Sequence, residues 1–257
     1  MNPIVVTGSA SGIGAATCEA LRAAGKSIIG VDIRDADILA DLSTPDGRQA
    51  AVADVLARCK GALDGLVCCA GLGPTVSPLS KIAAVNYFGA TAFLEGLFEA
   101  LIQGSESAAV VVSSNSLSLV EETWRDSALF QAFMADDEAL ALQLADEVEM
   151  GQVVYGGSKF ALTCRVRELA GTWGSAGVRL NAVAPGVVQT PLLQAGLDDP
   201  RFGQAIRDFV PPLGRRAEPA EIAELIGFLM SPRAGYMHGG VYFIDGGIDA
   251  QVRPQYF

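Results

Sequence analysis

A glycine-rich turn, Thr7-Gly8-Ser9-Ala10-Ser11-Gly12-Ile13-Gly14, follows the short β-branched run Ile4-Val5-Val6. Residues 15–24 have helical composition, and Ser27-Ile28-Ile29-Gly30-Val31-Asp32 is typical of a second strand. The order is therefore strand, glycine turn, helix, strand. The turn places free N–H groups at a helix N-terminus, and glycine lets the backbone approach an anion without a Cβ atom. This stretch therefore predicts a binding site for a pyrophosphate group.

The alternation of strands and helices continues along the chain. Further strands are expected at residues 37–40, 65–70, 108–113, 178–183 and 241–244. Further helices are expected at about 45–60, 84–102, 154–174 and 219–230. Because the strands are apolar throughout, they are typical of a parallel sheet buried on both faces. We predict an α/β fold, a Rossmann-type doubly wound parallel sheet of about seven strands, in a single domain spanning residues 1–257.

Composition restricts the classes of partner. The net charge of −11 disfavours nucleic acid and anionic membranes, because both demand clustered Lys and Arg. The sequence has no N-terminal signal pattern and no apolar run of membrane-span length, so we predict a cytoplasmic protein with no membrane partner. The five cysteines lack the paired spacing of a zinc site and suit a reducing compartment, so we predict no metal site. The single His238 is expected in a loop or at the surface.

Asp32 ends the second predicted strand, 18 residues after Gly14. This separation is close to the roughly 20 residues expected for an acid that binds the adenosine ribose of a dinucleotide. Its carboxylate can accept hydrogen bonds from two ribose hydroxyls and would repel a 2′-phosphate, which favours NAD over NADP. Arg34 leaves the alternative open, because its guanidinium could hold that phosphate.

A second motif, Tyr155-Gly156-Gly157-Ser158-Lys159, lies in the predicted helix at 154–174. Tyr155 and Lys159 are four residues apart, so they lie on the same face of the helix. An ammonium group near a phenol favours the phenolate and lowers the tyrosine pKa, which is about 10 when unperturbed. We therefore predict that Tyr155 acts as a general base.

These motifs together resemble those of the short-chain dehydrogenase/reductase family, over essentially the whole chain. The resemblance implies Ser114, Tyr155, Lys159 and Asn86 as the catalytic residues, with Ser113 as a possible substitute for Ser114. Asn86 would hold a water in a proton relay. The implied NAD-binding residues are Gly8, Ser11, Gly12, Ile13, Gly14, Asp32, Asp41, Leu42, Ala70, Gly71, Tyr155, Lys159, Pro185, Gly186, Val188 and Thr190.

The resemblance also implies a mechanism. Ser114 and Tyr155 would hold the substrate hydroxyl, Tyr155 would take its proton, and hydride would pass to the nicotinamide. Lys159 would lower the pKa of Tyr155 and bind the nicotinamide ribose.

The chain departs from the family pattern in two places. Cys68-Cys69-Ala70-Gly71 stands where the family commonly has Asn-Asn-Ala-Gly. Tyr155 follows Ser114 by 41 residues, far more than is usual, so an acidic helical insertion is expected at about 118–153. Residues 121–149 carry nine acidic residues against one basic residue, Arg125.

The insertion, with residues 31–37, 210–219 and 245–250, narrows the resemblance to the bacterial 3α-hydroxysteroid dehydrogenase/carbonyl reductase branch. This implies interconversion of the 3α-hydroxyl and 3-oxo groups of apolar, steroid-like substrates, with wider carbonyl reductase activity. One alternative is a dehydrogenase for a small secondary alcohol, a 3-oxoacyl thioester or a sugar. Another is a non-catalytic dinucleotide-binding regulator.

Two segments outside the motifs also carry predictions. The apolar residues of Pro191–Leu213 indicate either packing against the sheet or a substrate lid over a flat apolar substrate. We further expect a homodimer formed through the last helix and strand, Pro219–Ile244. In this family the catalytic helix often pairs with its copy in a second subunit. The acidic insertion would obstruct that contact, and the two copies of the insertion would repel each other there.

Overall fold

A computed structural model describes residues 2–119 and 122–255. Within these ranges the chain forms one seven-stranded parallel sheet in the order β3-β2-β1-β4-β5-β6-β7. The predicted single-domain Rossmann-type fold is therefore confirmed. The strands are β1 (Ile4–Thr7), β2 (Ile28–Asp32), β3 (Ile38–Leu39), β4 (Gly65–Cys68), β5 (Ala108–Val112), β6 (Arg179–Pro185) and β7 (Val241–Ile244).

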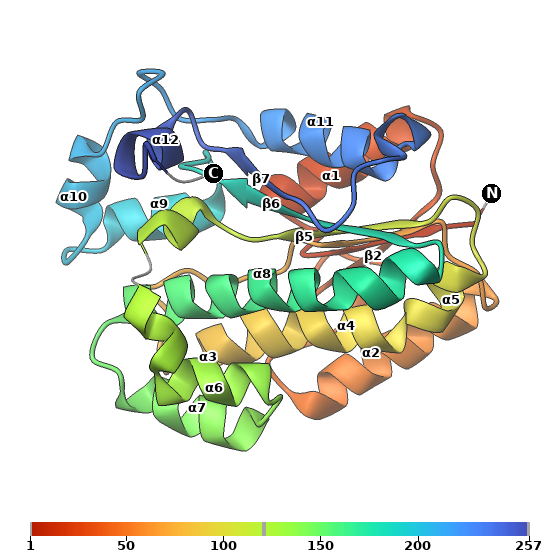
Figure 1. Cartoon of the computed structure of the whole chain (residues 1–257), viewed down its shortest axis with the longest axis horizontal. Coiled ribbons are helices and arrows are strands. Elements are labelled where there is room, and N and C mark those ends of the chain that lie inside the picture. The colour runs from red at the N-terminus through yellow and green to blue at the C-terminus, as the bar shows by residue number, and fades with distance from the viewer. Residues whose placement is uncertain (1, 120–121, 256–257) are drawn as a thin grey trace.

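Helices cover both faces of the sheet (Figure 1). One layer contains α1 (Gly12–Ala23) and α11 (Pro219–Met230), which pack against each other. The opposite layer contains α2 (Pro45–Cys59), α4 (Ala90–Gly96) and α8 (Gly151–Ser175). Because the strands are enclosed on both sides, β1, β4 and β5 are buried along their whole length, as their apolar sequences predicted.

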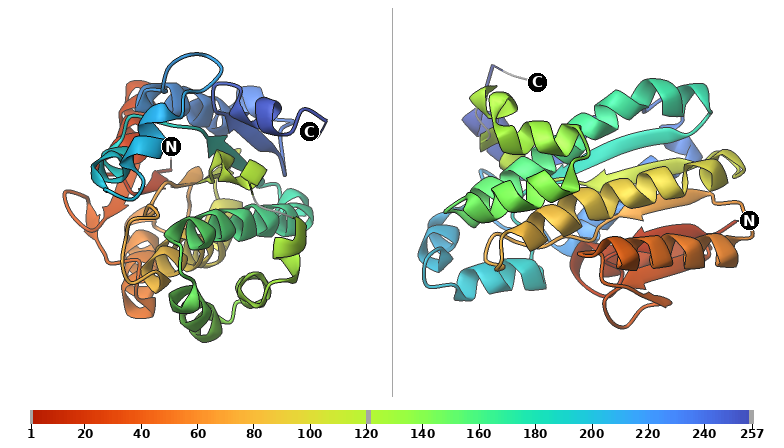
Figure 2. Two further views of the ribbon diagram at one scale, coloured as in Figure 1. Left: turned by 90° about the vertical axis from the view of Figure 1, so that its left-hand side faces the viewer. Right: turned by 90° about the horizontal axis from the view of Figure 1, so that it is seen from below.

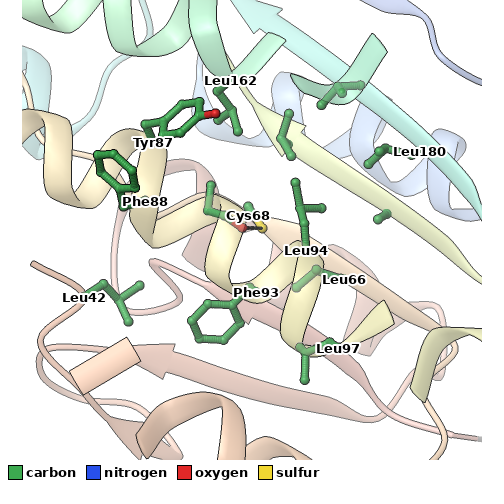
Figure 3. Close-up of a cluster of buried hydrophobic side chains, with 14 of the residues drawn as sticks. Leu42, Leu66, Cys68, Tyr87, Phe88, Phe93, Leu94, Leu97, Leu162 and Leu180 are labelled. Carbon is green, nitrogen blue, oxygen red and sulfur yellow. Dashed lines mark hydrogen bonds between the residues drawn. The ribbon is translucent and has the colours of Figure 1, made fainter. Parts of the chain in front are cut away.

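The larger core lies between the sheet and the α8 layer. Phe93, Leu94 and Leu97 of the α4 region lie in the same core cluster as Leu66 of β4 and Leu42 (Figure 3). The strand register aligns Thr7 with Cys68, and Cys68 with Val111. The residues that follow these strands therefore meet at one edge of the sheet.

The helix expected at 84–102 is interrupted. The chain instead forms α3 (Ser80–Ala83), the π-helical turn η1 (Ala84–Gly89), α4, and a short α5 (Phe98–Ile102). Hydrophobic periodicity does not register a single inserted residue, so the π-helical turn was not predicted. Such turns occur often at functional sites, and this one contains Asn86.

The 3₁₀ turn η2 (Asn115–Leu119) leads into the predicted insertion, which contains the 3₁₀ turn η3 (Glu122–Asp126), then α6 (Ala128–Met134) and α7 (Glu138–Glu147). Val120 and Glu121 lie outside the described residues. Figure 1 shows α6 and α7 beneath α3 and α8, and Figure 2 shows the same arrangement from two other sides. The buried side chains of α6, Leu129, Phe130, Ala132 and Phe133, join the larger core.

Ion pairs fix the insertion to the rest of the domain. Glu138 pairs with Arg48 of α2 at 2.5 Å, and Asp136 pairs with Arg165 of α8 at 2.6 Å. The Asp146 carboxylate also accepts a hydrogen bond from the backbone N–H of Ser80 at 2.7 Å. Several of the acids of this segment are thus matched by partners on the same chain.

Candidate active site

A cavity of about 1250 Å³ opens at the carboxyl ends of the strands. The strand order reverses there, because β1 lies between β2 and β4. This topological switch point is where open α/β sheets bind ligands. With the exception of Asn86, every predicted site residue lines this cavity.

The glycine turn forms the wall of the cavity next to α1. Gly8 and Gly12 have φ of +69° and +53°, a conformation that favours glycine. A Cβ atom on Gly8 would lie 2.7 Å from the backbone nitrogen of Ala70, and one on Gly14 only 2.0 Å from the Gly8 carbonyl oxygen. Ser11 and Ile13 line the same wall at the start of α1. The glycines of the turn therefore leave backbone atoms accessible where an anion would approach the helix N-terminus.

Asp32 lies at the end of β2 and is held by the backbone. One carboxylate oxygen accepts a hydrogen bond from Ala10 N–H at 3.0 Å, and the other from Ile33 N–H at 2.7 Å. This links the position of the acid directly to the glycine turn. Arg34 is exposed and lines the same part of the cavity, so the structure keeps both residues near the predicted ribose position.

Asp41 and Leu42 follow β3 along the same wall. Hydrogen bonds from Ser43 hold the pKa of the Asp41 carboxyl below its usual value. Leu42 is buried and takes part in the core, as Figure 3 shows, while still lining the cavity.

Ala70 and Gly71 form the floor between the glycine turn and α8. Ala70 N–H donates to the Thr7 hydroxyl at 3.2 Å. A Cβ atom on Gly71 would lie 3.3 Å from Asn86 Oδ1 and 3.4 Å from Lys159 Nζ, so little space separates this loop from the catalytic helix. The preceding Cys68 packs in the core, and burial raises its pKa to about 12. The cysteines that replace the family asparagines are thus neutral packing groups.

The loop after β6 closes the far side. A Cβ atom on Gly186 would lie 2.7 Å from the Asp245 Cα, so Pro185-Gly186 must pass close to the chain after β7. Val188 is buried, and Thr190 caps the helix α9 (Pro191–Asp198) by accepting a hydrogen bond from Leu193 N–H at 3.2 Å.

The two serines after β5 point in different directions. Ser113 donates to the Lys159 carbonyl oxygen at 3.2 Å and lies 2.7 Å from the Thr163 hydroxyl, so it faces α8. Ser114 lines the cavity together with Tyr155, and its hydroxyl accepts a hydrogen bond from Ser116 N–H at 3.1 Å. The geometry therefore favours Ser114 over Ser113 as the serine available to a substrate.

Lys159 is buried, with 4% of its surface exposed, and its ammonium donates to the Val112 carbonyl oxygen at 2.7 Å. Burial lowers its pKa to about 8. The pKa of Tyr155 is raised by burial, and the hydrogen bond with Ser114 opposes that rise. The expectation that Lys159 lowers the Tyr155 pKa therefore finds no support in the protein alone, because desolvation dominates at both groups.

Asn86 is fully buried and lies behind the floor of the cavity. Its side-chain oxygen accepts from Leu72 N–H at 2.7 Å, and its amide donates to the Leu72 carbonyl oxygen at 3.0 Å. The side chain thus holds the loop after β4 in place. Because the Asn86 side-chain amide is already hydrogen-bonded to Leu72, a proton relay at this residue would have to use other atoms.

Apolar side chains line the open end of the cavity. Leu192 and Leu193 of α9 and Phe202, Ile206 and Phe209 in and around α10 (Gly203–Asp208) contribute from the predicted lid. Their position on the cavity, with Phe209 46% exposed, argues against simple packing on the sheet. Sequence reasoning missed Trp124 of η3, which also lines the cavity. The sequence feature that could have pointed to Trp124 was the presence of a large aromatic residue within the insertion.

Features outside the cavity have structural roles. His238 lies in a loop, where its Nδ1 accepts from Leu180 N–H at 2.9 Å and its Nε2 lies 2.7 Å from the Ala170 carbonyl oxygen. Across residues 2–119 and 122–255, no cluster of three His, Cys, Asp or Glu residues could hold a metal ion. None of the helices in that part of the chain is long and apolar enough to span a membrane.

Comparisons with known proteins give a consistent result. A family model described as short chain dehydrogenase matches residues 2–122, and one described as enoyl-(acyl carrier protein) reductase matches residues 131–249. The chain is 52% identical to a 3-alpha-hydroxysteroid dehydrogenase/carbonyl reductase of Comamonas testosteroni, over 100% of both chains. It is 32% identical to a tropinone reductase homolog of Arabidopsis thaliana, over 95% of this chain and 78% of that one.

A solved structure gives the same picture. The 3-alpha-hydroxysteroid dehydrogenase from Pseudomonas sp. B-0831, complexed with NADH, superimposes with a TM-score of 0.96. It is 52% identical, and the match covers 99% of each chain.

Proposed function

We propose that this protein is an NAD(H)-dependent oxidoreductase that interconverts a secondary alcohol and a ketone. The proposal starts from the family, because the chain belongs to the short-chain dehydrogenases. One observation carries the proposal. Ser114, Tyr155 and Lys159 converge on the same cavity as the glycine turn and Asp32. A proton-transfer group and a dinucleotide site therefore lie side by side.

The residues present fit NAD. The glycine turn leaves backbone N–H groups for the pyrophosphate, Asp32 suits the adenosine ribose, and Lys159 would hold the nicotinamide ribose. When bound, NAD supplies the hydride acceptor or donor. The protein supplies orientation and the proton path: Ser114 orients the substrate oxygen, and Tyr155 takes the hydroxyl proton during oxidation and returns it during reduction.

The proposed substrate is the 3α-hydroxyl or 3-oxo group of a steroid, with other carbonyl compounds also reduced. The name of the Comamonas relative and the apolar lining of the open end support this substrate class. A small alcohol would leave much of that apolar surface uncovered, which makes it the second candidate.

The test is direct. The protein is mixed with NAD and a 3α-hydroxysteroid, and NADH formation is followed by absorbance. We expect turnover, and we expect Tyr155→Phe to lose nearly all of it while still binding NADH. Absence of turnover with hydroxysteroids, bile acids and simple alcohols would contradict the proposal and favour a non-catalytic dinucleotide-binding regulator.

We also infer a homodimer formed through α11 and β7. The insertion contacts α3 and α8, whereas β7 is the last strand of the sheet and its residues are only half-buried. Tyr236, in the loop before β7, is fully exposed. Light scattering should show a dimer that Phe228→Asp in α11 dissociates. The matched change Leu140→Asp in the insertion should leave it intact, and the opposite pattern would place the interface at the insertion.

A further inference from the structure

Trp124 lies directly on the catalytic helix. Its contact is with Gly157, two residues after Tyr155 in α8. A Cβ atom on Gly157 would lie 2.0 Å from Cζ2 of the indole and 2.5 Å from Cη2. The indole can therefore take this place only because residue 157 has no side chain. The pair joins the insertion to the helix that carries Tyr155 and Lys159.

Other aromatic side chains hold the indole in this position. Trp124 packs edge-on against Phe130 of α6, with ring centroids 5.3 Å apart, and against Phe160 of α8, at 5.9 Å. Such pairs are favourable beyond simple burial. Phe160 is in turn covered by the Arg125 guanidinium, 4.7 Å from its centroid. The orientation of Trp124 is thus fixed by the insertion and by α8 together.

The part of Trp124 that these contacts leave uncovered lines the cavity. The side chains on the predicted lid, among them Leu192 and Phe209, line the cavity as well and are partly exposed. Tyr155 and Ser114 belong to the same cavity. A flat apolar molecule whose hydroxyl reaches Tyr155 would bury area against an indole that is already in place, with little ordering cost.

We propose that Trp124 is the wall that sets substrate specificity, and that Gly157 is glycine so that the indole can lie on the catalytic helix. The inference rests on the proposed function and concerns the same site. Trp124 selects for fused-ring or other extended flat apolar alcohols and ketones over small ones. The indole contacts parts of the substrate that do not change during hydride transfer, so it binds substrate and transition state equally and acts on KM more than on kcat.

The first experiment compares two substrates, a 3α-hydroxysteroid and cyclohexanol, with saturating NAD. We expect Trp124→Ala to lower kcat/KM for the steroid by about 10- to 100-fold, mainly through KM, with little change for cyclohexanol. Trp124→Phe should keep most of the steroid preference. Leu140→Ala, an exposed change on α7 in the same insertion, is the matched control and should behave as wild type. The KM for NAD should be unchanged in all three.

The second experiment tests the role of Gly157 with a double-mutant cycle. Gly157→Ala should sharply reduce steroid turnover when Trp124 is present, because the new methyl group overlaps the indole. In the Trp124→Ala background the same change should cost at least about tenfold less. The cycle also remains informative if one single variant is poorly folded, since melting temperatures of all four proteins are recorded beside the rates.

Three results would overturn the proposal. Equal losses for the steroid and cyclohexanol in Trp124→Ala would show a structural role only. Unchanged kcat/KM values for both substrates in that variant would remove Trp124 from the substrate site. A Gly157→Ala effect of the same size in both backgrounds would show that the indole contact is not what requires glycine. If wild type oxidises no alcohol at all, the proposed function fails instead, which the cyclohexanol and steroid controls distinguish.

Discussion

Replacing Lys159 by methionine should abolish turnover without destabilising the protein at neutral pH. Burial lowers the pKa of Lys159 from its ordinary 10.5 to about 8. At about 1.4 kcal/mol per pKa unit, the charged ammonium destabilises the folded state by about 3 kcal/mol at neutral pH. Methionine fills a similar volume without charge, but it leaves the Val112 carbonyl without the donor that Lys159 supplies, at a cost of about 1–3 kcal/mol. Removal of the buried charge therefore offsets or exceeds the loss of the hydrogen bond, and the variant should be as stable as wild type or more stable.

The pH dependence separates this explanation from others. Below about pH 8 both folded and unfolded chains keep the proton, so the full cost is present. Between about pH 8 and 10.5 the folded chain releases it first, so wild-type stability rises with pH. Lys159→Met lacks this contribution.

Urea unfolding at pH 7 and pH 9.5 provides the assay. The stability of wild type relative to Lys159→Met should increase by about 2 kcal/mol between the two pH values. The exposed Lys60, changed to methionine, is the control and should show no such difference. A Lys159→Met protein that is clearly less stable than wild type at pH 7, with the same pH dependence, would refute the reasoning.

Three further predictions concern the cavity. Asp32→Ala should raise the KM for NAD and relax discrimination against NADP, because the carboxylate that faces the ribose is lost; a wild type that already prefers NADP would assign the role to Arg34. Ser114→Ala should reduce kcat by about 10²-fold or more, whereas Ser113→Ala should act mainly on melting temperature, since its hydroxyl binds α8; reversed effects would exchange the two serines. Gly8→Ala should prevent NADH binding measured by fluorescence, because its φ of +69° and the nearby Ala70 leave no room for a methyl group; tight binding by this variant would contradict the geometry of the turn.

The sequence was sufficient for the parts of the structure that follow from local pattern. The helix at Pro219–Met230 and the strand at Val241–Ile244 occur with the predicted bounds, because a proline start and a β-branched apolar run are strong local signals. The glycine turn was equally clear. All three depend on residues close together in the chain.

Other features depend on contacts between distant residues. Ser113 and Ser114 are identical in type, and only the position of α8 shows that the Ser113 hydroxyl is already hydrogen-bonded to that helix. Lys159, four residues away, led us to expect a lowered Tyr155 pKa, but burial by the whole fold raises that pKa. Trp124 could not be assigned because its partner, Gly157, lies on another element.

The position of β5 inside the sheet, between β4 and β6, has a consequence for synthesis of the chain. On one side β5 pairs with β4, which is made earlier, and on the other with β6, which is made only after the insertion and α8. Until β6 emerges from the ribosome, the nascent sheet ends in an apolar edge, Ala108–Val112, with unpaired backbone groups. Such edges promote aggregation. The long insertion therefore lengthens the vulnerable interval during translation, and pausing within it would increase the demand for chaperones.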